Sequence, residues 1–143
     1  MLENVSTYQK IINASTEYLS EVRDFVSMHA ARHGFSDKEI ADIRLAVDEA
    51  CTNIIKHAYN YDPSKEVGIV ISVDPSKLMI TITDQGKPFD KKKYQKPSLK
   101  KQIAQKKRGG MGVHLMRNLM DEVRYSFDNN TNTLCMCKNR SAS

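Results

Sequence analysis

The chain has no tryptophan, only three cysteines and no long apolar run among its 143 residues. It lacks the run of about 18 apolar residues that a membrane-spanning helix needs, and its first residues, MLENVSTYQK, contain no apolar stretch of a signal peptide. The cysteines, Cys51, Cys135 and Cys137, have the spacing of neither a zinc site nor a disulfide framework. We therefore expect reduced thiols, a cytoplasmic protein and, from the length, a single domain over 1–143.

Basic residues are concentrated in one segment. Between Lys87 and Arg108 there are nine lysines and one arginine against a single acid, Asp90, which gives this segment a net charge of +9. The whole chain carries +5, so the remainder is acidic, at −4. Such a segment either attracts anions or is simply a solvated loop. Because it has only two aromatic residues, Phe89 and Tyr94, and no known nucleic-acid motif, we discount nucleic acid as a partner.

Two helices are predicted in the first part of the chain. Apolar residues recur at helical spacing from Thr16 to His33, and Gly34 is expected to end this helix. Ser36 and Glu39 form a capping box at the start of the second helix. Its apolar stripe has gaps of 3, 4, 3, 4 and 4 residues and consists of Ile40, Ile43, Val47, Ala50, Ile54 and Ala58.

The remaining segments alternate as strands. These are YQKIINA (8–14), VGIVISV (67–73), KLMITIT (77–83), EVRYSF (122–127) and TLCMCK (133–138). Asp74-Pro75-Ser76 and DNNTN (128–132) predict hairpin turns, and VHLMRNLM (113–120) predicts a short helix. This order predicts an α+β protein, a two-layer sandwich with helices on one face of a mostly antiparallel sheet.

The second predicted helix carries an acid and an amide one turn apart, Glu49 and Asn53. At about 100° per residue they lie about 40° apart around the axis, with Asn53 about 100° from the centre of the apolar stripe. The helix alone favours an ordinary solvated face, although small Ala46 nearby leaves room for a ligand. The alternative is a catalytic acid beside a metal ligand.

Asp84 ends the strand KLMITITD with the parity of its apolar residues. A carboxylate on that side requires a donor partner, because an unpaired buried charge is costly. Gly86 follows two residues later and permits a tight turn and a close backbone approach. Two interpretations stay open: Asp84 forms an Asx-turn with Gly86, or it binds a ligand.

The segment RGGMGVHLM places Gly110 and Gly112 directly before a predicted helix. The N–H groups of a helix N-terminus attract anions, and glycines let a phosphate approach closely. Arg108 adds positive charge beside them. A single Gly-x-Gly is weak evidence, since many are only turns.

In combination these motifs resemble the GHKL ATP-binding superfamily over roughly Thr16 to Lys138. The segments DEACTNIIKHAY, TDQGKPFD and RGGMGVHLMRNLMDEV are similar to the stand-alone anti-sigma-factor serine/threonine kinases of bacterial partner-switching systems. The resemblance implies a Bergerat-type ATP-binding fold, the cofactors ATP and Mg²⁺, and an ATP lid at about 87–108.

The resemblance also implies roles for individual residues. Glu49 would be the general base and Asn53 a Mg²⁺ ligand, which suits a carboxylate and an amide oxygen. Asp84 would accept a hydrogen bond from the adenine amino group, and Gly86 would let the base pack against the turn. The other nucleotide-binding residues expected are Arg108, Gly110, Gly112 and, through a water, Thr133.

The function implied is that of an ATP-dependent protein serine/threonine kinase. It would phosphorylate a small anti-anti-sigma (STAS-like) partner and sequester a sigma factor or another output protein. Members of this family dimerise, so a homodimer is expected. The alternative is a nucleotide-gated protein-binding module without significant phosphotransfer. Glu49 favours the enzyme, because a pure binding module does not need it.

Overall fold

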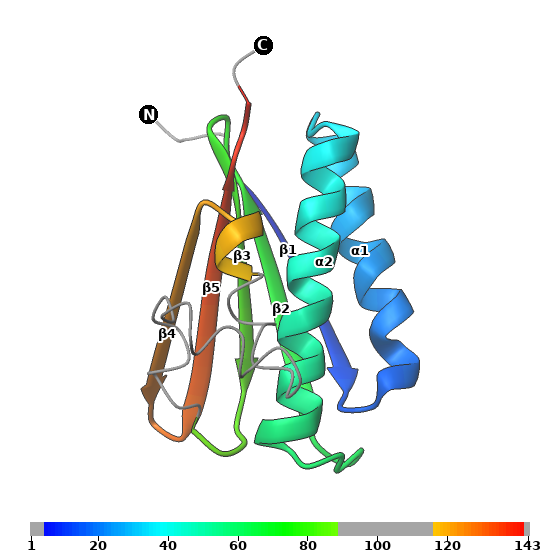
Figure 1. The fold of residues 1–143 in the computed structure, drawn as a ribbon, viewed down its shortest axis with the longest axis vertical. Helices are drawn as coiled ribbons and strands as arrows, with labels where there is room; N and C mark the ends of the chain where they lie inside the picture. The colour runs from blue at the N-terminus through cyan, green and yellow to red at the C-terminus, as the bar shows by residue number, and fades with distance from the viewer. Residues whose placement is uncertain (1–4, 89–115, 142–143) are drawn as a thin grey trace, which may run out of the picture.

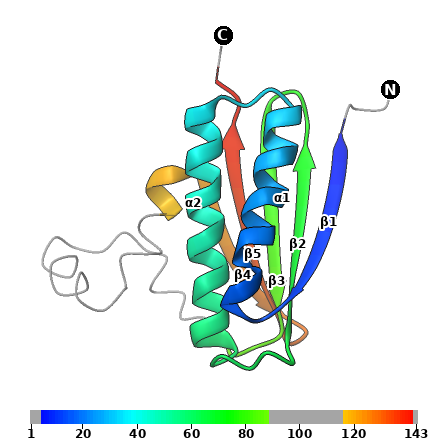
Figure 2. The ribbon, with the colours of Figure 1, turned by 90° about the vertical axis from the view of Figure 1, so that its right-hand side faces the viewer.

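Two layers make up the structure, a computed structural model that describes residues 5–88 and 116–141 (Figures 1 and 2). The helical elements are η1 (Thr16–Tyr18), α1 (Leu19–Arg32), α2 (Asp37–Asn53) and the π-helix η2 (Ile54–Ala58). The strands are β1 (Ser6–Asn13), β2 (Glu66–Val73), β3 (Lys77–Asp84), β4 (Glu122–Asp128) and β5 (Thr131–Asn139).

The strands form one sheet in the order β1-β2-β3-β5-β4, and every neighbouring pair is antiparallel. Figure 2 shows α1 and α2 side by side on one face of this sheet. The predicted two-layer α+β sandwich is therefore confirmed. Within the described ranges, no helix is both long and apolar enough to cross a membrane.

The predicted end of α1 and the predicted start of α2 are also confirmed. Gly34 has a positive φ of 85°, its N–H donates to the carbonyl of Ala31, and the N–H of Phe35 donates to Ala30, which together form a Schellman motif. The capping box is complete at the start of α2, where Ser36 and Glu39 bond to each other's backbone N–H groups. One boundary differs, because Thr16–Tyr18 forms a 3-10 turn before α1 begins.

The core lies between the helices and the sheet. The central residues of the predicted α2 stripe are buried there, and Ile43 and Val47 are completely covered. Alternate residues of β2 and β3 meet them from the sheet, as the strand pattern predicts. Met116 and Met120 add to this core from the far side of the long connection, and residues 116–119 are helical.

Both predicted hairpin turns are present. The side chain of Asp74 accepts hydrogen bonds from the backbone N–H groups of Ser76 and Lys77 between β2 and β3. Asn129 and Asn130 both have positive φ between β4 and β5, as a type I′ turn requires. Because β5 returns beside β3, Asp84 at the end of β3 lies opposite Asn132, 48 residues later in the chain.

The end of α2 departs from the prediction. The apolar stripe extends to Ala58, but the last turn is the π-helix Ile54–Ala58, where the N–H of Tyr59 donates to the carbonyl of Ile54. A π-turn is wider than an α-turn and is often found at functional sites. No glycine or proline marks it in the sequence.

Candidate functional site

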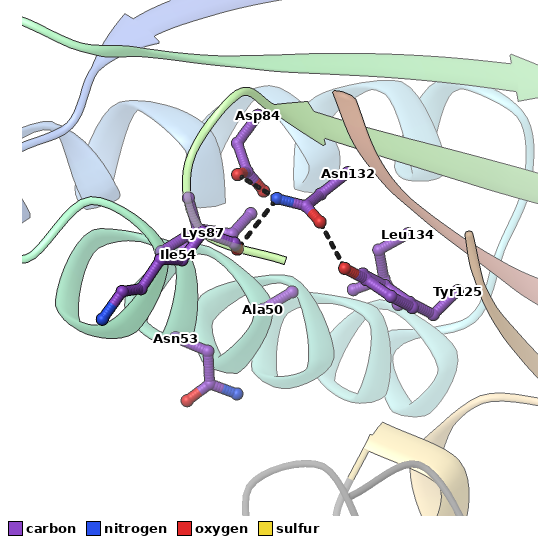
Figure 3. A pocket seen from close by; sticks show the side chains of 9 residues that line it. Ala50, Asn53, Ile54, Asp84, Lys87, Tyr125, Asn132 and Leu134 are labelled. Carbon is purple, nitrogen blue, oxygen red and sulfur yellow. Dashed lines mark hydrogen bonds between the residues drawn. The ribbon is translucent and has the colours of Figure 1, made fainter. Parts of the chain in front are cut away.

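A pocket lies between the C-terminal part of α2 and the ends of β3 and β5 (Figure 3). Its walls are largely apolar on the helix side, and polar groups gather at the sheet. The residues that line it are Ala50, Asn53, Ile54, Ala58, Asp84, Lys87, Tyr125, Asn132 and Leu134. An apolar slot with a few convergent polar groups is the usual form of a small-molecule site.

Asp84 lies at the polar end of this pocket and is only 5% exposed. Its Oδ1 accepts from the backbone N–H of Gly86 at 2.9 Å and from Nδ2 of Asn132 at 2.8 Å. Burial raises the pKa of Asp84, although these two hydrogen bonds oppose the shift. The Asx-turn is therefore present, and neither bond uses Oδ2, which leaves that oxygen for a further donor.

Asn132 is a site residue that the sequence prediction missed. Its Nδ2 also approaches the backbone carbonyl oxygens of Gly86 at 3.2 Å and Lys87 at 3.1 Å. Its Oδ1 accepts from the hydroxyl group of Tyr125 on β4 (Figure 3). A signal existed in the sequence, because Asn132 has the same parity as Leu134 and Met136, as Asp84 has on its own strand.

Gly86 packs against the π-turn. A Cβ atom at this position would lie 2.4 Å from the carbonyl oxygen of Ala58, which no side chain can tolerate without movement. The N–H of Lys87 donates to that same oxygen at 2.9 Å. The close backbone approach expected at Gly86 therefore exists, and its partner is the end of α2. The predicted contact between Gly86 and a base stays a prediction.

Tyr59 stabilises the same turn after β3, and the sequence prediction also missed this residue. Its side chain is buried, and its hydroxyl donates to the carbonyl of Glu66 at 2.6 Å while accepting from the N–H of Gln85 at 2.8 Å. One residue thus connects the end of the π-turn, the start of β2 and the exit of β3. These contacts hold Asp84 in place without a ligand.

Asn53 lies at the other side of the pocket, and Glu49 is not among the residues that line it. Asn53 lines it, and Figure 3 shows its side chain pointing away from the Asp84–Asn132 pair. Glu49, one turn earlier, is half-buried. Among the described residues, no side chain hydrogen-bonds to either. Ala46 is fully buried in the core, so it does not provide the open space that the sequence suggested.

Thr133 requires a correction. Burial alternates along β5, so Asn132 and Leu134 face the pocket while half-buried Thr133 points to the opposite face of the sheet. The structure therefore places Asn132 at the pocket, rather than the predicted Thr133. Arg108, Gly110, Gly112 and most of the predicted lid at 87–108 lie outside the described residues, and their roles stay predictions.

Comparison with known proteins defines the class. The family model of the histidine kinase-like ATPase domain matches residues 12–138. The chain therefore belongs to the histidine kinase-like ATPase family, which confirms the superfamily resemblance of its motifs. Membership of an ATPase family implies that the chain binds ATP.

Two relatives within this family are named serine-protein kinases. The chain is 39% identical over 129 residues to the serine-protein kinase RsbW of Bacillus licheniformis, covering 87% of this chain and 80% of the relative. It is 37% identical over 130 residues to the RsbW of Bacillus subtilis strain 168, with the same coverage.

A solved structure has the same fold. The crystal structure of the RsbU and RsbW domains of Rv1364c from Mycobacterium tuberculosis superposes with a TM-score of 0.67. The match covers 96% of this chain and 33% of that chain at 18% identity, so this likeness concerns the fold alone.

Proposed function

We propose that the protein is an ATP-dependent serine/threonine kinase of the anti-sigma type. The observation that carries the proposal is a buried carboxylate, Asp84, at the polar end of an apolar pocket in a histidine kinase-like ATPase fold. The relatives named serine-protein kinase support a hydroxyl group as the acceptor.

The adenine base would lie at the Asp84 end of the pocket. Ala50, Ile54 and Leu134 provide apolar surface for a flat ring, and Oδ2 of Asp84 can accept from its exocyclic amine. A hydrogen bond to a charged acceptor contributes about 1.5–3 kcal/mol. This donor would satisfy the oxygen that Gly86 and Asn132 leave unused.

The phosphates would extend toward Asn53. Mg²⁺ keeps several waters and phosphate oxygens when bound, so one side-chain oxygen from the protein is sufficient. Asn53 fits this requirement, and the described residues contain no cluster of three or more His, Cys, Asp or Glu that could hold a metal by themselves. Bound Mg²⁺ would neutralise the phosphate charge.

Glu49 would then act as the general base. As the γ-phosphoryl group passes to the attacking hydroxyl oxygen, Glu49 accepts the hydroxyl proton and ADP leaves. Its half-buried position one turn from Asn53, with no described side chain bonded to it, leaves the carboxylate available. Arg108, Gly110 and Gly112 would contact the phosphates.

The proposed acceptor is a small anti-anti-sigma (STAS-like) protein, and the unphosphorylated acceptor would displace a sigma factor or another output protein. A homodimer in the cytoplasm completes the proposal. The motif resemblance supports each of these, and the two relatives named serine-protein kinase support a protein as the acceptor.

Phosphotransfer tests the proposal directly. The purified chain is incubated with Mg²⁺ and γ-labelled ATP, together with a small STAS-like protein encoded beside it. We expect label on a serine or threonine of the partner. If ATP binds but no label is transferred to any co-encoded partner, the protein is a nucleotide-gated binding module instead.

A further inference from the structure

The Asn132 amide has every polar atom committed inside the protein. Nδ2 faces three acceptors: Oδ1 of Asp84 at 2.8 Å and the carbonyl oxygens of Gly86 at 3.2 Å and Lys87 at 3.1 Å. Oδ1 of Asn132 accepts from the Tyr125 hydroxyl. Asn132 is 3% exposed, so water contributes little to this arrangement.

These contacts fix which way the amide points. In the flipped orientation its oxygen would face a carboxylate and two carbonyl oxygens, none of which can donate. The hydroxyl of Tyr125 can donate or accept, so it is compatible with either orientation of the amide. The three acceptors therefore determine the orientation of the Asn132 amide, and the Tyr125 hydroxyl supplies the donor for its oxygen.

We propose that Asn132 is a positioning residue that holds Oδ1 of Asp84 so that only Oδ2 is presented to the ligand. The inference rests on the proposed function, because it assigns Oδ2 to the amine of the base. Without Asn132, the carboxylate could rotate about its last bond and share its two oxygens between the Gly86 N–H and the ligand. The same amide joins β5 to the residues that follow β3, which stabilises the turn beneath the base.

The substitution Asn132→Asp tests this role through a proton. In this variant two carboxyl groups would lie about as close as the present 2.8 Å contact, and two such groups cannot both be ionised easily. When the pair holds one proton, the introduced carboxyl group can donate to Oδ1 of Asp84 as the amide does. When the proton is lost, the donor becomes a repelling acceptor.

The readout is the dissociation constant of ADP at several pH values between 5 and 8, measured for the variants and the wild type by calorimetry. We expect Asn132→Ala to weaken ADP binding by about tenfold or more at every pH. Asn132→Asp should bind better than Asn132→Ala at acid pH. Above the pKa of the pair, its ratio to the wild type should worsen by about tenfold per pH unit.

Other ionisable groups are controlled by taking this ratio. Lys87 and Tyr125 line the pocket, Tyr59 lies beside Gln85, and His57 is exposed on η2. The wild type contains all of them, and the nucleotide titrates equally in each sample. Tyr125→Phe keeps the ring and removes the hydroxyl, and it should give a smaller loss of affinity without a pH-dependent ratio.

The outcomes separate this inference from the proposed function. If wild-type protein does not bind ADP, or Asp84→Asn binds it unchanged, the proposed function fails and the inference with it. If those two results are as proposed, equal and pH-independent affinities of Asn132→Asp and Asn132→Ala would show that Asn132 only fills space. Wild-type affinity in both variants would also overturn the inference.

Discussion

The two ends of α2 use their polar side chains differently. At the N-terminal end, Oε1 of Glu39 accepts from the Ser36 N–H and Oε2 from the Ser141 N–H, each at 2.8 Å. Asp42, one turn on, accepts from Nζ of Lys138 at 3.1 Å. At the C-terminal end, Glu49 and Asn53 have no hydrogen-bonded partner among the described side chains.

This contrast separates residues that hold the fold from residues that remain available to a ligand. The bonds of Glu39 and Asp42 connect α2 to β5 and to Ser141 beyond its end, and they need no ligand. Asn53 lines the pocket, Glu49 lies one turn before it, and neither satisfies another group of the described fold. Substitutions at the two ends should therefore affect different properties.

Glu49→Ala should have the largest effect. A general base contributes about 10²–10⁴-fold to rate and little to the affinity for the ground state. We expect phosphotransfer to fall by this factor while ATP binding and thermal stability stay near those of the wild type. A time course with the labelled partner measures it, and unchanged rates would exclude Glu49 as the base.

Asn53→Ala should also weaken nucleotide binding, and only where Mg²⁺ contributes. Changes to groups around a metal commonly reduce its affinity by about 10–100-fold, so the Mg²⁺-dependent part of ATP affinity should fall by at least about tenfold. Titrations with and without Mg²⁺ give this part by difference. An equal loss in both conditions would contradict metal ligation.

Gly86→Ala should act on stability. The new Cβ would meet the Ala58 backbone, and overpacking of this kind costs about 1–3 kcal/mol. Gly68→Ala is the matched control, because its Cβ would meet the Thr83 hydroxyl at 2.8 Å, which can move away. Urea unfolding of the two variants should therefore differ, and equal losses would mean that the π-turn yields easily.

Glu39→Gln tests the opposite end of α2. The amide must place an NH₂ group against one of two N–H donors, so we expect a loss of about 1 kcal/mol at pH 7 and no loss of phosphotransfer. Hydrogen bonds from Ser36 and then Ser141 lower the pKa of Glu39 in the folded protein. Its contribution is therefore complete above the unfolded pKa of about 4.3 and is lost as the pH falls through the folded value.

Thermal unfolding at pH 7 and in acid measures this difference. The wild type should lose its advantage over Glu39→Gln as the pH falls below about 4. A constant difference at all pH values would show that the charge of Glu39 does not matter. Reduced phosphotransfer in the folded variant would remove the distinction between the two ends.

Much of the fold follows from local patterns. The strand alternation, the capping box and Gly34 are short-range signals, and each predicted its element. Strand parity also predicted that Asp84 is buried. The same parity places Asn132 on the buried face of β5, whereas the family resemblance implied Thr133, one residue away on the opposite face.

Other features of the site depend on long-range packing. The Asp84–Asn132 hydrogen bond requires β5 to pair with β3. The two residues are 48 positions apart, and the local sequence does not predict this strand order. The π-turn lies where η2 packs against Gly86 and leads into Tyr59, although the sequence pattern of residues 54–58 predicts an ordinary helix. Local sequence therefore predicts the elements, while the contacts between their ends complete the pocket.

ATP binding by Asp84→Asn tests the central claim most directly. The asparagine oxygen can take the place of Oδ1 and keep both of its donors, which puts the NH₂ group at the position of Oδ2, facing the adenine amine. Because burial raises the pKa of Asp84, removing this charge should not destabilise the free protein at neutral pH. We predict a folded variant whose calorimetric affinity for Mg-ATP is lower by at least about tenfold. Wild-type affinity in that folded variant would contradict the placement of the base at Asp84.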